Sequence, residues 1–169
     1  MRKRIATKTK TLDNGIKVVT RKVVDAPDLE WILQAAAVRA LRAMPEFGAE
    51  WAPRADGSWP QFTIAGDFNA GRRSIRESVK AKATGLTPGE SDLRVYLAGG
   101  RLCMIEYKAA KGRVSADQVT RHALLCGLGF EIEVVRASSE EEAAAATVAL
   151  VRGWLGESSE SWDGMNRQR

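Results

Sequence analysis

The sequence has few of the residues that build metal fingers, redox centres or histidine-based active sites. It contains two cysteines and one histidine among 169 residues. Cys103 and Cys126 lack the close spacing that metal fingers and redox motifs require. Both lie in apolar surroundings, so we expect two reduced core residues.

Long hydrophobic runs are also missing. No apolar run approaches the length of a membrane span, and the basic N-terminus is followed by Thr, Lys and Asp instead of the apolar stretch of a signal peptide. We therefore expect a cytosolic protein. A chain of this length with 44% hydrophobic residues and no long low-complexity tract predicts one compact domain with two loose ends.

Positive charge is in excess and is unevenly distributed. The formal net charge is +5 and the pI is about 9.5, which suits a polyanionic partner. A soluble protein with a charged tail has the same balance, so both interpretations stay open. The basic residues that crowd the N-terminus are Arg2, Lys3, Arg4, Lys8, Lys10, Lys17, Arg21 and Lys22.

The first part of the chain predicts a basic β-hairpin and a helix. Residues 5–24 alternate Thr or Val with Lys or Arg around Asp13-Asn14-Gly15, a turn signature because Asn and Gly tolerate positive φ. Asp28 can cap a helix over 29–44, which Pro45 ends. Downstream, short elements are expected at 61–65 (strand) and 74–83 (helix).

The second part predicts strand, strand, helix, strand, helix. A hairpin is expected from Asp92–Leu97 and Leu102–Lys108. Ser115 with Gln118 forms a capping-box pattern at a helix start, and glycines end that helix. A strand after a crossover helix usually joins the sheet in parallel. The remaining expected elements are a strand over 130–135 and a helix from Ser138 or Ser139 to about Leu155.

These elements predict an α/β fold with a mixed sheet flanked by helices. The expected organisation is a basic hairpin over 1–24, a main domain over 25–155 and a flexible polar tail over 156–169.

Three side chains of the predicted hairpin share one face. Glu106 and Lys108 are two apart in a strand and point the same way, whereas Tyr107 points to the other face. A three-residue loop over 99–101 would place Asp92 opposite Lys108, on that same face. A loop centred on Gly99 gives the same parity, but a two-residue loop would turn Asp92 away.

Two carboxylates converging with a lysine suit phosphodiester hydrolysis. Hard carboxylate oxygens hold Mg²⁺ or Mn²⁺ and leave positions for water and a phosphate oxygen. The lysine would position the attacking water or stabilise developing charge. A bare E-x-K, however, is usually a solvated hairpin in which Glu and Lys happen to alternate.

A series of motifs in order favours the catalytic interpretation. Their pattern is P-G-x-x-D, then I-E-x-K, then G-R-x-S-x-x-Q, and it resembles the VRR-NUC family within the PD-(D/E)XK nuclease superfamily. The resemblance covers about residues 29–155. The segments are Pro88-Gly89-Glu90-Ser91-Asp92-Leu93, Ile105-Glu106-Tyr107-Lys108, Gly112-Arg113-Val114-Ser115-Ala116-Asp117-Gln118, Gly129 before a Val-rich strand, Glu30 with Gln34, and Asn69 with Arg72, Arg73 and Ser74.

The resemblance implies a restriction-endonuclease-like fold and a role for each motif residue. Asp92, Glu106 and the Tyr107 carbonyl would be ligands of Mg²⁺ or Mn²⁺, with Glu30 a second-tier acidic residue. Lys108 would be catalytic, and Gln118 would support the active site. The chain departs from the family pattern at Glu90-Ser91, where an apolar residue and Pro often precede the Asp.

Several supporting residues have an alternative structural role. Gln118 could simply cap its helix, Glu30 could be a first-turn acid stabilised by the helix dipole, and His122 could be structural. The basic residues that flank the site could contact the DNA backbone or form a solvated face. These candidates for DNA contact are Arg72, Arg73, Arg76, Lys111 and Arg113.

The implied function is a metal-dependent DNA endonuclease of phage or bacterial type. The family resemblance suggests homodimers that act on branched DNA such as four-way (Holliday) junctions, and a two-fold dimer suits symmetric cuts. The main alternative is a non-catalytic, structure-selective DNA-binding module on the same fold. A third, an interaction protein with a basic tail, predicts no salt-sensitive DNA binding.

Overall fold

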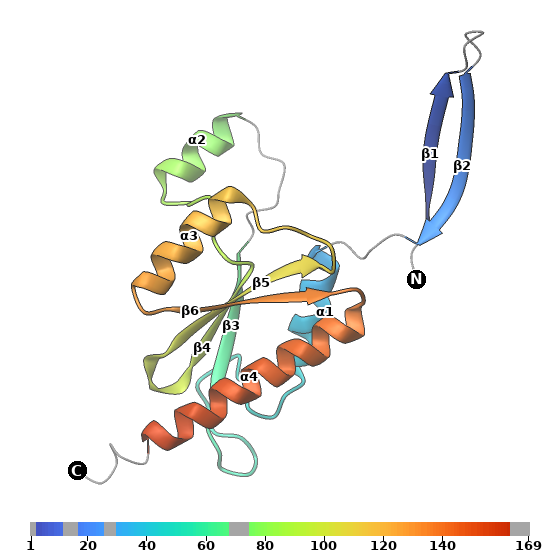
Figure 1. The fold of residues 1–169 in the computed structure, drawn as a ribbon. Helices are drawn as coiled ribbons and strands as arrows, with labels where there is room; N and C mark the ends of the chain where they lie inside the picture. Colours follow the sequence, from blue (N-terminus) through green and yellow to red (C-terminus); the bar gives the residue numbers. More distant parts are fainter. Residues whose placement is uncertain (1–2, 12–16, 26–29, 68–74, 163–169) are drawn as a thin grey trace.

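The computed structural model describes residues 3–11, 17–25, 30–67 and 75–162 of the chain (Figure 1). Its main body is a four-stranded mixed sheet flanked by helices, as the sequence predicts. None of the helices in these ranges is long and apolar enough to cross a membrane.

The sheet has the order β3-β4-β5-β6. Strands β3 (Phe62–Gly66), β4 (Leu93–Leu97) and β5 (Leu102–Ala109) pair antiparallel, and β6 (Glu131–Ala137) joins β5 in parallel. The parallel partner follows a helix, which is the connection that a right-handed crossover provides. Glu106 and Lys108 therefore lie on the central strand β5, and Asp92 directly precedes the other central strand, β4.

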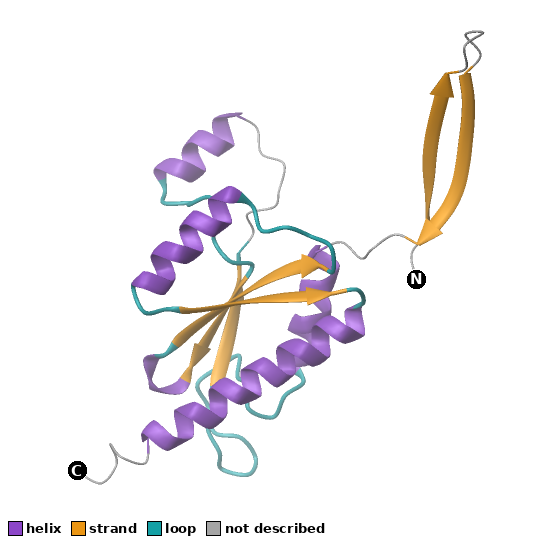
Figure 2. Ribbon diagram, viewed as in Figure 1, coloured by secondary structure: helices purple, strands orange, loops and turns teal. Residues whose placement is uncertain are grey.

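Helices cover both faces of this sheet (Figures 1 and 2). Helix α1 (Glu30–Arg42) packs against α4 (Glu140–Trp162), and the two cover one face together. Helix α3 (Ala116–Gly127) packs against β6 on the opposite face, with α2 (Ile75–Ala83) beyond it. Helix α4 continues to Trp162, past the end expected near Leu155.

The hydrophobic core lies between the sheet and the α1–α4 layer. Alternate residues of β5, namely Cys103, Ile105 and Tyr107, are fully buried there, as the two-residue period of a strand requires. Leu33 of α1 and Trp154 of α4 close the core from the other side. The even-numbered residues of β5 consequently face α3, where the chemistry-bearing side chains are.

The expectation that both cysteines are core residues is wrong for Cys126. Cys103 is buried, whereas Cys126 is exposed on α3, and neither forms a disulfide. Helix α3 has apolar residues on its inner and outer faces, so its composition alone does not show which of them point inward.

Helix α3 has well-defined ends. Ser115 accepts a hydrogen bond from the Gln118 N–H (3.2 Å) while the Gln118 side chain accepts one from the Ser115 N–H (2.9 Å), which confirms the predicted capping box. At the other end Gly129 has a φ of 90°, and Phe130 N–H donates to Leu125 O (3.0 Å). This is the geometry of a Schellman motif.

At the N-terminus, β1 (Lys3–Thr11) pairs antiparallel with β2 (Lys17–Asp25) in a separate two-stranded sheet. The turn predicted at Asp13-Asn14-Gly15 lies outside the described residues, and the basic hairpin as a unit stays a prediction.

Candidate active site

Asp92 lies where β4 begins to separate from β5. The last β4–β5 pair is Leu93 with Ile105, so Asp92 is level with Glu106 and not with Lys108. The loop is thus centred on Gly99, with Leu97 N–H donating to Arg101 O at 2.8 Å. Of the loops that the sequence allows, the structure has the one centred on Gly99, which keeps the two carboxylates on one face, and not the three-residue loop that would place Asp92 opposite Lys108.

Both the side chain and the backbone of Asp92 are held in place. Its Oδ2 accepts a hydrogen bond from the Tyr107 N–H (2.8 Å), in place of the strand partner that β4 no longer provides. Gln34 Nε2 on α1 donates to the Asp92 carbonyl (2.7 Å). Because the N–H and C=O of a strand residue point to the same side, the Tyr107 carbonyl faces the Asp92 side of β5.

Glu106 is fully buried at the centre of the site. Its Oε1 accepts from Lys108 Nζ (2.7 Å) and from Gln118 Nε2 (2.5 Å). Its Oε2 has no hydrogen-bond donor among the described residues; His122 Nε2 lies 3.8 Å away. A buried carboxylate oxygen without a donor is a position where a cation would fit.

Burial raises the pKa of both carboxyl groups. The pKa of Glu106 rises to about 7, because burial and the neighbouring Asp92 outweigh the opposing effect of Lys108. Burial also raises the pKa of Asp92, although the Tyr107 N–H and a hydrogen bond with Glu106 oppose it. The two groups are close enough to share a proton, which is the position that a divalent cation can take instead.

Lys108 is charged despite being only 5% exposed. Burial alone would lower the pKa of its ammonium, but the hydrogen bond and charge of Glu106, together with Glu30, raise it. Glu30 Oε2, at the start of α1, lies 3.3 Å from Lys108 Nζ. Glu30 therefore reaches the site through its contact with Lys108, and its charge also helps to raise the pKa of Asp92.

We predict that stability depends on pH and metal through Glu106. Since its folded pKa is about 7 and its ordinary value is 4.5, the folded chain binds this proton more tightly, and the metal-free free energy of unfolding falls as pH rises between those values. A divalent cation competes with that proton, so excess MnCl₂ should raise Tm more at about pH 8 than at about pH 5.5.

Thermal melts with MnCl₂ or EDTA check this prediction. The Glu106→Gln variant is the control, because it keeps the shape of the side chain but cannot ionise. It should show a flatter pH dependence and little rise in Tm with Mn²⁺. Equal Mn²⁺ effects at both pH values in the wild type would contradict the prediction.

The departure from the family pattern at Glu90-Ser91 is accommodated by partners on α3 and β4. Glu90 pairs with Arg121 (2.9 Å) and Arg94 (3.2 Å). The buried Ser91 Oγ lies 3.4 Å from His122 Nε2. These contacts tie the loop before Asp92 to the helix that carries Gln118, so Glu90 and Arg121 are positioning residues that sequence reasoning did not find.

Gly89 explains the glycine of the P-G motif. Its φ is 80°, and a Cβ there would lie 2.4 Å from Asp117 O and 2.8 Å from Gln118 N. The loop thus packs directly on the backbone of the first turn of α3, which only glycine permits. This close approach fixes the distance between Asp92 and Gln118.

The candidate DNA-contact residues are only partly placed. Lys111 and Arg113 are exposed in the loop after β5, beside the site. That loop is held by Arg136 of β6, whose NH1 donates to Gly112 O (2.5 Å). Arg72 and Arg73 lie outside the described residues, and of Arg76 only the backbone, in α2, is described.

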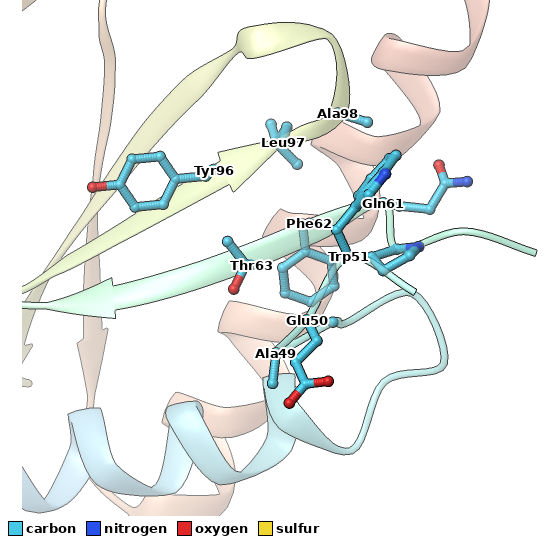
Figure 3. Close-up of a pocket in the computed structure, with 11 residues that line it drawn as sticks. Ala49, Glu50, Trp51, Gln61, Phe62, Thr63, Tyr96, Leu97 and Ala98 are labelled. Carbon is cyan, nitrogen blue, oxygen red and sulfur yellow. The ribbon is translucent and has the colours of Figure 1, made fainter. Parts of the chain in front are cut away.

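An apolar groove lies at the opposite end of the sheet from Asp92 (Figure 3). It is lined mainly by Trp51, Phe62 and Tyr96, and the exposed Trp51 stacks on Trp59 with ring centroids 4.8 Å apart. Among the described lining residues there is no Lys or Arg and one acid, Glu50. The groove therefore lacks the groups that phosphate chemistry needs.

Within the described residues, no three His, Cys, Asp or Glu side chains are grouped in a way that could hold a metal ion. The candidate site offers two carboxylates and a backbone carbonyl, a donor set that suits a cation which keeps several waters. Comparison with family models, curated proteins and solved structures gives no match. The family resemblance thus depends on the motifs alone.

Proposed function

We propose that this chain is a Mg²⁺- or Mn²⁺-dependent DNA endonuclease of the VRR-NUC type with a restriction-endonuclease-like fold. One observation carries the proposal: Asp92, directly before β4, lies level with Glu106 of β5, both have raised pKa values, and Lys108 forms an ion pair with one oxygen of Glu106. Such an arrangement is costly for a purely structural role.

The donors fit a small divalent cation. Asp92, Glu106 and the Tyr107 carbonyl would hold it, and the Glu106 oxygen without a donor is the clearest position. When bound, the metal polarises the phosphoryl group and lowers the pKa of a bound water. Glu30, which pairs with Lys108, would influence the metal site through that lysine without binding the metal.

Lys108 and Gln118 provide the remaining chemistry. The buried ammonium of Lys108 can orient the attacking water and stabilise charge that develops on the phosphate. Gln118 fixes the rotamer of Glu106 through Oε1, which leaves Oε2 for the metal. Lys111 and Arg113 at the rim would neutralise backbone phosphates.

The substrate we propose is branched DNA such as a four-way junction, cut by a homodimer whose two sites act on two strands. The alternative, a non-catalytic DNA-binding module, gives no use for the buried Glu106 and the half-buried Asp92, whose carboxylates would repel a polyanion. One observation favours the non-catalytic module: the basic residues alone would suffice to bind DNA.

A cleavage panel tests the proposal. Wild type and Glu106→Gln are incubated with single strand, duplex, flap, splayed arm and four-way junction, each with Mg²⁺, Mn²⁺ or EDTA. We expect metal-dependent cleavage of a branched substrate by wild type and none by Glu106→Gln, while binding persists in both. Salt-sensitive binding without cleavage under any condition would favour the non-catalytic module.

A further inference from the structure

Helix α3 presents an unusually apolar outer surface, which we call the α3 face. Its large members are 58% (Val119), 54% (Leu124), 66% (Leu128) and 37% (Phe130) exposed. Only Leu125 of this helix is buried. Val119, Ala123 and Cys126 follow one row at helical spacing, and Leu124 with Leu128 follow the adjacent row.

The α3 face carries no charge. Between Ser115 and Glu131 the charged side chains are Asp117, in the first turn, and Arg121, which is paired with Glu90 on the inner side. A nucleic acid needs Lys or Arg on the surface that it contacts. The face is therefore unsuited to DNA and suited to an apolar protein surface.

The size of the face matches a subunit interface. The exposed fractions of its four large side chains amount to on the order of 400 Å² of apolar surface, a size at which patches mark interaction sites. A standard interface buries about 800 Å² per subunit, and about two-thirds of it is apolar in homodimers. The face thus supplies most of the apolar area that one subunit must contribute.

We propose that the α3 faces of two copies of this chain pack against each other around a two-fold axis. In an isologous pair the same surface meets itself, so every apolar side chain finds apolar partners and no charge is buried. The small residues Ala123, within the first row, and Gly127, at the end of the helix, leave room for Leu124 and Leu128 of the second copy.

The pairing has a consequence for the site on the inner face of α3. Gln118 on that inner face contacts Glu106, so pairing through the outer faces places the two active sites on opposite sides of the helix pair. This consequence depends on the proposed nuclease function, whereas the pairing does not, and a mass measurement without DNA or metal tests the pairing alone.

The mass in solution and a native thiol provide the test. We expect wild type to be a dimer of the 18.4 kDa chain by light scattering, with monomers for Leu124→Glu and Leu128→Glu that keep the wild-type circular dichroism. The matched control is Ala149→Glu, an exposed position on α4 at the other face of the sheet, which should stay dimeric.

Cys126 lies on the α3 face while Cys103 is buried, so a short bis-maleimide should link two wild-type chains. Cys126→Ser and Leu124→Glu should both prevent the link. Dimerisation should persist or strengthen with added salt, because the face is apolar and the chains repel through their net charge of +5. A monomeric wild type, or a dimer that survives both glutamate substitutions, would overturn the proposal.

Discussion

Replacement of Lys108 by methionine is expected to lower the rate of phosphodiester cleavage by roughly a thousandfold or more, because a buried cation beside the reacting phosphate is lost. DNA binding should change little, since the exposed Lys111 and Arg113 remain. Single-turnover cleavage with saturating enzyme, compared with wild type at the same Mn²⁺ concentration, measures the effect.

The same substitution also changes stability in a diagnostic way. Without Lys108 the pKa of Glu106 rises further, so at pH 8 its buried carboxyl must either take up a proton or carry a charge with no cation, and the free energy of unfolding should fall by about 3 kcal/mol. The double variant Lys108→Met/Glu106→Gln removes both charges and should recover most of that loss while staying inactive. Urea unfolding checks both values; near-wild-type cleavage by Lys108→Met would exclude the catalytic role.

Substitution of Gly89 by alanine is the second change with a large expected effect. The added Cβ would overlap the backbone of Asp117, and the alanine would have to adopt a positive φ. We therefore expect a loss of about 3 kcal/mol or more in unfolding free energy. Displacement of α3 would move Gln118 away from Glu106, and cleavage should fall at least tenfold in molecules that remain folded.

Gly85→Ala is the matched control for this prediction. Gly85 also has a positive φ, 93°, but nothing lies within 4 Å of a Cβ there. The Gly85→Ala variant should lose only the free energy that a positive φ costs alanine, about 1–2 kcal/mol of unfolding free energy, and should retain cleavage. Equal destabilisation of the two variants would show that strain, and not the contact with α3, accounts for the glycine in the P-G motif.

The central part of the fold could be predicted because local rules determine it. The two-residue period of a strand places Glu106 and Lys108 on one face and Tyr107 in the core, where its hydroxyl meets Thr147 Oγ1 at 3.2 Å. The capping box of α3 is a local pattern of two residues, Ser115 and Gln118, and it was predicted from them. The parallel β6 follows from the crossover rule.

Other features depend on tertiary contacts that no local pattern contains. Gln34 reaches the Asp92 carbonyl across 58 residues of sequence, and Glu90 meets Arg121 across the gap between a loop and a helix. The exact position of Asp92 depends on the conformations of Gly99 and Gly100, both at positive φ, and the sequence allows several such loops. The similarity of the fold to restriction endonucleases and the nuclease activity stay predictions.

Gln118 uses both ends of one amide. Its Oε1 accepts from Ser115 N–H and its Nε2 donates to Glu106, so the orientation of the amide is fixed by two different neighbours. Glutamate at this position would keep the cap but lose the donor, and asparagine is one methylene shorter. The side-chain NH₂ of Gln118 should therefore give a distinct, slowly exchanging pair of NMR signals that shifts when the charge on Glu106 changes, so that occupancy of the site can be followed without any substrate.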